Sequence, residues 1–274
     1  MIRLALAGAV AALALGAQAA DPVAFVADLK GSATIEGDGK LGFLAELAPG
    51  TRLLLGTGSV VAVTYASTGA EYTISGPGEF LVTAREVRAE KGTAPKLRPV
   101  SKLDDPGIVA RVSRTATASI RMRGMIPDAA SGKTALEYPV DTRVATLQPQ
   151  MRWRDDAQAG GFTVSVVDAS GKEIWKGSTK PASARPAVKL SPAMAYTWTV
   201  MTPKGKVGEA RFETLSAEAV AKAEKSRAAA KTFSDRVMHA FLLQDLGATQ
   251  DARDTWASLA RERPDIPELA VLAR

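Results

Sequence analysis

The chain has 274 residues, of which 46% are hydrophobic and 23% are charged, and its formal net charge is +6. This composition is ordinary for a globular protein and argues against general disorder, and the length allows two modest domains. The sequence contains no cysteine, which excludes disulfides and thiol chemistry, so hydrophobic cores must hold the domains together.

Residues 1–19 have the pattern of a secretory signal peptide. One arginine precedes an apolar run, and the small-residue triplet Ala17-Gln18-Ala19 ends it. We expect cleavage after Ala19 and export to the periplasm. No later stretch reaches the roughly 18 uninterrupted apolar residues that a membrane span needs, so we expect no span.

Residues 22–92 are predicted to form an all-β domain. Short apolar runs alternate with a period of two, and Gly-Asp-Gly, Pro-Gly, Gly-Thr-Gly and Gly-Pro-Gly turns separate them. Residues Gly37 to Gly42 formally match the G-x-G-x-x-G pattern of dinucleotide sites. Strands rather than a helix follow them, so we interpret this stretch as a hairpin turn.

The same region contains a recognisable order of residues. A leading glycine, a Leu-x-x-Gly-x-x-Leu element and a Thr-Gly-x-x-x-x-Val strand precede a glycine-containing turn. The residues that carry this order are Gly31, Leu47, Gly50, Leu53, Thr57, Gly58, Val63, Gly69, Ile74 and Pro77. The order resembles the periplasmic FecR-type domain, and the resemblance implies a β domain in an exported protein of the cell envelope.

Residues 93–137 are predicted to form a basic connector. From Arg85 to Arg123 the chain has ten Lys and Arg residues against four Asp and Glu residues. A solvated linker with one or two edge strands explains this charge, because arginines discourage edge pairing. The alternative is contact with an anionic glycan or cell-wall polymer. The residues proposed for that contact are Arg111, Arg114, Arg121 and Arg123.

Near its end the connector contains Gly132-Lys133-Thr134, which match the last three residues of the phosphate-binding-loop motif. Such a loop needs a glycine five residues before the Gly-Lys pair, and that position is Pro127. Proline has no N–H group and a fixed φ, so it cannot take part in the phosphate cradle. We therefore expect no nucleotide site.

Residues 138–215 return to the strand pattern, with turn signals about every ten residues, which is typical of a β-sandwich. The spacing from Leu190 to Tyr196 resembles the corner of immunoglobulin-like and fibronectin type III domains. This resemblance implies an inward Leu190, a Tyr196 hydroxyl bonded to the backbone and a core Trp153. Trp175 and Trp198 have two interpretations, core packing, which is preferred, and a sugar-binding surface.

Residues 216–274 are predicted to be helical. Ser216 is a good N-cap, two amphipathic helices are separated at Gly247, and a short helix begins near Pro267. The small residues, aromatic and proline from Ala240 to Pro264 resemble one tetratricopeptide repeat. One repeat cannot bury its own apolar face, so this hairpin must dock on the sandwich or on a partner. The candidate partner-binding residues are Phe241, Leu242, Leu243, Trp256 and Leu259.

The sequence offers few candidate catalytic residues. His239 is the only histidine and has no serine or acid at a catalytic spacing. The acid pairs Asp104-Asp105 and Asp155-Asp156 lack a further ligand at loop spacing, and turn or cap roles fit them better.

We therefore expect a non-enzymatic exported protein, mainly β with a C-terminal α segment: a FecR-like domain, an immunoglobulin-like or fibronectin III-like sandwich and a tetratricopeptide-like hairpin. We expect it to bind envelope proteins as a scaffold or signalling-accessory module, without cofactor, metal or nucleic acid. The alternatives are the basic module for an anionic polymer and an unrecognised hydrolase. Fold alone does not decide among these functions.

Overall fold

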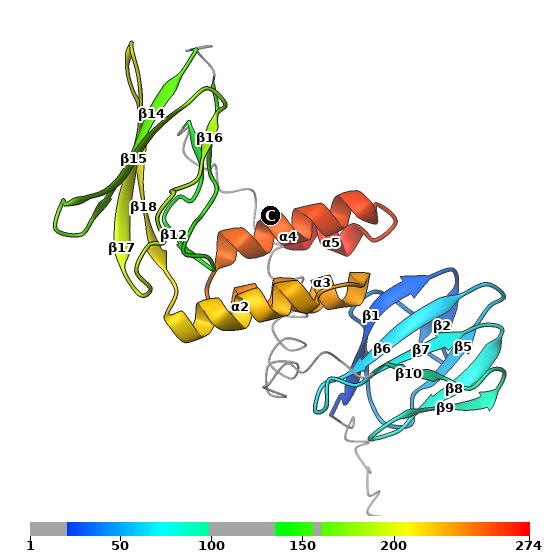
Figure 1. Ribbon diagram of the computed structural model, residues 1–274. Helices are drawn as coiled ribbons and strands as arrows, with labels where there is room; N and C mark the ends of the chain where they lie inside the picture. Colours follow the sequence, from blue (N-terminus) through cyan, green and yellow to red (C-terminus); the bar gives the residue numbers. More distant parts are fainter. Residues whose placement is uncertain (1–20, 99–134, 156–159) are drawn as a thin grey trace, which may run out of the picture.

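The computed structural model describes residues 21–98, 135–155 and 160–274. Two β domains are joined by a C-terminal helical segment, which lies between them in Figure 1. The prediction of a mainly β chain with a C-terminal helical segment is confirmed. None of the helices in these described ranges has both the length and the apolarity needed to cross a membrane.

The N-terminal β domain consists of two five-stranded antiparallel sheets, ordered β10-β7-β6-β1-β4 and β3-β2-β5-β8-β9. Its strands are β1 (Ala24–Lys30), β2 (Ala33–Ile35), β3 (Gly39–Lys40), β4 (Glu46–Leu47), β5 (Arg52–Leu55), β6 (Val60–Tyr65), β7 (Glu71–Ser75), β8 (Gly78–Val82), β9 (Val87–Lys91) and β10 (Lys96–Arg98). Because β10 pairs with β7, this sheet continues past residue 92 into the stretch predicted as connector.

The stretch from Gly37 to Gly42 is a hairpin turn, as predicted. Strands β2 and β3 pair on either side of it, with Thr34 opposite Lys40. Gly37 and Gly39 have φ angles of 79° and 88°, a left-handed conformation that glycine adopts without strain. No helix follows, so the geometry of a dinucleotide-binding loop is absent from these residues.

The second β domain has a three-stranded sheet, β11-β13-β16, and a five-stranded sheet, β12-β18-β17-β14-β15. Its strands are β11 (Leu136–Tyr138), β12 (Thr142–Val144), β13 (Met151–Trp153), β14 (Phe162–Asp168), β15 (Glu173–Thr179), β16 (Ser183–Ala184), β17 (Ala195–Thr202) and β18 (Gly205–Thr214). The pairing is antiparallel except between β12 and β18, which run parallel. Side chains of both sheets form one core, which confirms the prediction of a sandwich-like packing.

The tyrosine hydrogen bond predicted from the Leu190 to Tyr196 spacing is confirmed. The buried Tyr196 hydroxyl accepts from the Ser191 N–H at 2.9 Å and donates to the Ser191 carbonyl at 3.4 Å. Trp153 and Trp198 both lie in the sandwich core, so the sugar-binding interpretation is wrong for Trp198. Trp175 is half-buried at the edge of the same core.

The helical segment comprises α2 (Ala217–Ala229), α3 (Phe233–Asp245), α4 (Thr249–Glu262) and α5 (Pro267–Leu272). The predicted Ser216 N-cap is confirmed, because its side chain accepts from the Ala219 N–H at 3.2 Å. Gly247, with φ 79°, lies in the turn between α3 and α4. Pro267 begins α5, where its missing N–H has no cost.

Candidate functional site: the helical segment between two β domains

The five helix side chains predicted to bind a partner are buried within this chain. The set comprises Phe241, Leu242, Leu243, Trp256 and Leu259, and none is more than 3% exposed. The Phe241 and Trp256 rings meet edge to face at a centroid distance of 4.7 Å. In this arrangement the apolar face of the hairpin is covered by the chain itself, which was one of the two alternatives for its docking.

The N-terminal domain supplies part of that cover. Phe25 and Ala27 of β1 pack in the helical core, together with Phe43 and Leu44 from the loop between β3 and β4. Phe43 meets Phe233 of α3 edge to face, with ring centroids 6.2 Å apart. The helical core therefore extends onto one face of the N-terminal domain, whose own core is separate.

Strand β1 can join two cores because successive side chains of a strand point to opposite faces. Ala24 and Val26 face the core of the N-terminal domain, while Phe25 and Ala27 face the helices. The sequence analysis missed this docking face. The signal was present as an unbroken apolar run, which is typical of a strand covered on both sides rather than on one.

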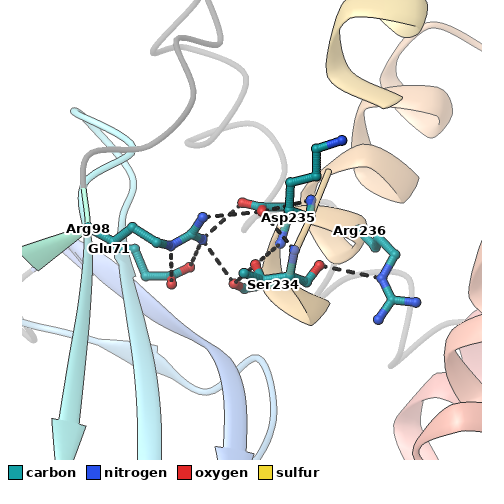
Figure 2. A network of polar contacts seen from close by, with 7 residues as sticks. Glu71, Arg98, Ser234, Asp235 and Arg236 are labelled. Carbon is teal, nitrogen blue, oxygen red and sulfur yellow. Dashed lines mark hydrogen bonds and ion pairs between the residues drawn. The ribbon is translucent and has the colours of Figure 1, made fainter. Parts of the chain in front are cut away.

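A charged network joins β10 to the start of α3 (Figure 2). The Arg98 guanidinium donates to Glu71 on the neighbouring strand, with Nε 3.0 Å from Oε1. It also binds both carboxylate oxygens of Asp235, with Nη2 2.9 Å from Oδ1 and Nη1 3.2 Å from Oδ2. Nη2 lies 3.3 Å from the Ser234 hydroxyl as well. The two carboxylate side chains are only 7% and 10% exposed, whereas the Arg98 side chain is 31% exposed, so the carboxylates are shielded from water and the guanidinium is partly open to it.

Asp235 has a second role at the same place. Its carboxylate accepts from the Thr232 N–H at 2.9 Å, and the Thr232 hydroxyl accepts from the Asp235 N–H, which forms a capping box. Burial favours a higher pKa for Asp235, but hydrogen bonds from Arg98 and Thr232 outweigh it and leave the pKa below its ordinary value. The hydrogen bond to Glu71 is the main cause that raises the pKa of Arg98. Asp235 and Arg98 are therefore both ionised at neutral pH.

A second arginine also joins the N-terminal domain to the helices, but this one belongs to the helical segment and reaches into the β domain. Arg263, which follows α4, donates to Asp28 of β1 at 2.5 Å and to the Leu29 carbonyl at 2.6 Å. Its guanidinium also lies over the Phe233 ring, 5.2 Å from the centroid. One arginine thus reaches from the β domain to the helices, and the other reaches from the helices to the β domain.

The second β domain is held by the first turns of α4. The Asp251 carboxylate accepts from the Tyr138 hydroxyl at 2.5 Å and from the Ala145 N–H at 2.7 Å. The Gln250 side chain accepts from the Val140 N–H at 3.1 Å. Burial raises the pKa of Asp251 above its ordinary value, and the hydrogen bond from Tyr138 offsets this only in part. The side chains of Asp251 and Gln250 therefore bind α4 to the sandwich.

A small cavity of about 180 Å³ lies where α2, α3 and α4 meet the residues after β12. His239 of α3 lines it, with Nδ1 3.1 Å from the Ser226 hydroxyl of α2. The histidine is buried. Burial first, and the nearby positive charge of Arg227 second, lower the pKa of His239 to about 4. The imidazole is therefore neutral at pH 7 and a poor proton acceptor there.

This low pKa predicts that stability falls as the pH falls. Between pH 6.5 and pH 4 the unfolded state binds a proton at His239 that the folded state does not bind, so acid favours unfolding. From pH 7.5 to pH 5, we expect the wild-type chain to lose about 2 kcal/mol more unfolding free energy than a His239→Gln variant. Urea denaturation of both proteins at the two pH values measures this difference. Equal losses would show that His239 is not shielded from protonation.

A groove of about 980 Å³ borders the outer side of the sandwich near the turn between α3 and α4. Its charged side chains are of both signs, and Arg143 is paired with Glu213 at 3.2 Å. Across the described residues, no group of three His, Asp or Glu side chains is arranged to hold a metal ion. The groove has a mixed polar and apolar lining, and no catalytic set is assigned to it.

The other predicted contact residues lie outside the described part of the chain. This applies to Arg111, Arg114, Arg121 and Arg123, and to the Gly132-Lys133-Thr134 stretch with Pro127. The contact with an anionic polymer and the absence of a nucleotide site therefore stay predictions. Arg98 belongs to the same basic stretch of the sequence, and the structure places it in a network between the N-terminal domain and the helices.

The comparisons with known proteins identify no relative, so the function must be argued from the residues of this chain. No protein-family model matches the chain, and no curated protein matches it at a significant level.

Proposed function

We propose that this protein is a non-enzymatic, exported scaffold or signalling-accessory module of the cell envelope, which binds other envelope proteins. In this proposal the N-terminal domain is of the FecR type, the second is an immunoglobulin-like or fibronectin III-like sandwich, and the helices form a tetratricopeptide-like bracket between them. The signal-peptide pattern of residues 1–19 and the FecR-like residue order support export to the periplasm.

The observation that carries the proposal is that the helical segment contacts both β domains. Its apolar face packs on the N-terminal domain, and its charged side chains contact both β domains. Burying a side chain such as Phe25 or Phe43 stabilises the docked arrangement by about 1.5 to 3 kcal/mol. Domains within one chain are otherwise expected to move relative to one another. This chain instead holds its two β domains at a fixed spacing, which suits a protein that positions partners.

Affinity capture from an envelope extract tests this function, with the full chain as bait. A protein partner should be retained by the wild-type chain and by an Arg88→Met variant, which removes an exposed pair with Glu86. Capture should fall at least about tenfold with Arg98→Met, because that change loosens the spacing between the domains. Circular dichroism of each bait checks that it is folded.

Salt separates the protein partner from the alternative. An anionic polymer bound by exposed arginines should be lost between about 0.05 and 0.5 M salt, because the Debye length shrinks over that range. A protein bound mainly by packing should remain. Equal capture by the Arg98→Met and wild-type baits would contradict the scaffold, and recovery of a glycan alone would favour the basic binding module.

A further inference from the structure

Helix α2 is held by fewer buried side chains than α3. Over its 13 residues it buries Val220, Ala223 and Ser226, one of which is polar, whereas α3 buries nine residues over the same length. An element with few buried apolar contacts opens locally at a lower free energy than the core does. Helix α2 also runs from the last strand of the sandwich to α3 (Figure 1). Opening of α2 therefore loosens the connection between the sandwich and the other helices.

The polar residue among these three contacts a titratable ring. The Ser226 hydroxyl lies 3.1 Å from His239 Nδ1, and both residues are only 8% exposed, so the second half of α2 covers the imidazole. His239 also lines the cavity of about 180 Å³ between the helices. A water molecule needs about 10 to 15 Å³ of such a volume, so the cavity is large enough for water to bring a proton to the ring while the chain is folded.

A proton on His239 is poorly matched to α2. A neutral imidazole has one donor and one acceptor nitrogen, whereas the protonated ring donates from both. The Ser226 hydroxyl can accept one of these bonds, and no other group among the described residues bonds to the ring. Burial, followed by the positive charge of Arg227, lowers the pKa of His239. Arg227 also belongs to α2, so separation of α2 from α3 removes both the cover and the repelling charge.

The charged groups that α4 brings to the cavity do not respond in the same way. They are Asp251, which accepts from Tyr138 and from the Ala145 N–H, and Asp254, which is paired with Arg152. These bonds hold α4 on the sandwich without His239. Burial raises the pKa of Asp251, so proton uptake there favours the folded state as the pH falls.

The remaining lining residues add little charge to the ring's surroundings. Glu224 reaches the cavity from α2, but it is exposed, so water and salt screen its charge. The residues after β12, Ala145 and Thr146, are uncharged. Helix α2 is therefore the element that acid should release.

We propose that protonation of His239 opens α2, while α3 and α4 stay packed on the two β domains. The covered ring binds a proton less tightly than the uncovered ring, so the opening equilibrium shifts toward the open form as the pH falls below 6.5. Acid then uncovers the face of α3 around His239 and loosens one of the connections that set the spacing of the domains. The proposal concerns the fold, so it holds whether or not the chain is an envelope scaffold.

Thiol labelling of the full chain measures this opening, because the sequence contains no cysteine. Ala223→Cys places one thiol on the buried side of α2, and Ala252→Cys places one in α4 as a matched control, since both alanines are at most 2% exposed. A pyridyl disulfide labels each protein at pH 7.5 and pH 5, with the urea-unfolded protein as the reference rate. Protection at position 223 should fall about 30-fold, the factor expected when opening returns the pKa of His239 from about 4 to 6.5.

Adding His239→Gln to each labelled protein isolates the role of the ring. Without the histidine, the fall at position 223 should be less than about threefold, and at pH 5 the thiol at position 252 should stay at least about tenfold better protected than the one at position 223. An equal acid response with and without His239 would overturn the proposal. Equal labelling at the two positions would overturn it as well, because the whole helical segment would then be opening.

Hydrogen–deuterium exchange of the unaltered chain keeps the test valid if Ala223→Cys disturbs the packing. After correction for the intrinsic exchange rate at each pH, peptides from α2 should lose more protection in acid than peptides from α4. Retention of α2 protection at pH 5, or a larger loss in α4, would contradict the opening of α2.

Discussion

A chain that ends at Leu215 should aggregate or melt well below the full-length chain. Removing α2 to α5 takes away the cover of Phe25, Ala27, Phe43 and Leu44 in the N-terminal domain. Exposing the three larger side chains costs on the order of 5 kcal/mol, and the exposed patch favours association. Thermal melting by circular dichroism, together with light scattering, measures both effects.

A paired substitution shows whether that patch is the cause. Phe43→Ser should lower the stability of the full chain, because it removes a buried contact with Phe233. In the chain ending at Leu215 the same change should reduce aggregation, because the ring is exposed there. A truncated chain that stays soluble and β-rich, with an unchanged melting temperature, would contradict the docked arrangement and would return the helices to the role of a free binding segment.

Loss of the Arg98 guanidinium should be costly as well. An Arg98→Met variant keeps much of the side-chain volume but leaves the Glu71 and Asp235 carboxylates buried without their cation. Because the Arg98 side chain is 31% exposed, the loss should stay below the value for a fully buried pair and amount to about 2 kcal/mol of unfolding free energy. Chemical denaturation at pH 7 measures the loss.

Two comparisons make the Arg98 result specific. Arg88→Met removes an exposed ion pair and should cost less than about 1 kcal/mol. Adding Asp235→Asn to Arg98→Met should recover part of the loss, because one of the unpaired charges is gone. The pKa of Asp235 is lowered in the folded wild-type chain, so its stabilising contribution is lost as the pH falls through that pKa, and the deficit of the variant should shrink in acid. A deficit that is no larger than that of Arg88→Met would show that the network does not hold the domains.

The features that the sequence predicted correctly are those set by local chemistry. Gly37 and Gly39 determine their turn, Ser216 caps its helix, and Tyr196 bonds to a backbone only five residues away. Each of these depends on residues that are neighbours in the chain, so spacing alone is informative.

The features that the sequence did not predict depend on distant partners. A charge count cannot distinguish Arg98, which meets Asp235, from the arginines that follow it. The apolar face of α3 and α4 was visible in the sequence, but its cover by Phe25 and Phe43 was not, because strand alternation does not tell which element lies above a strand. The burial of His239 beside Ser226 was missed for the same reason.

The pairing of Arg263 with Asp28 joins residues 235 positions apart, and Arg98 meets Asp235 across 137 positions. Contacts of such long sequence separation form late, because the intervening chain must be brought together first. During synthesis the N-terminal β domain therefore emerges with Phe25 and Phe43 uncovered, and only the last helices of the chain can close that surface. The time between these two events is the period in which the protein is most exposed to misassembly and to proteolysis.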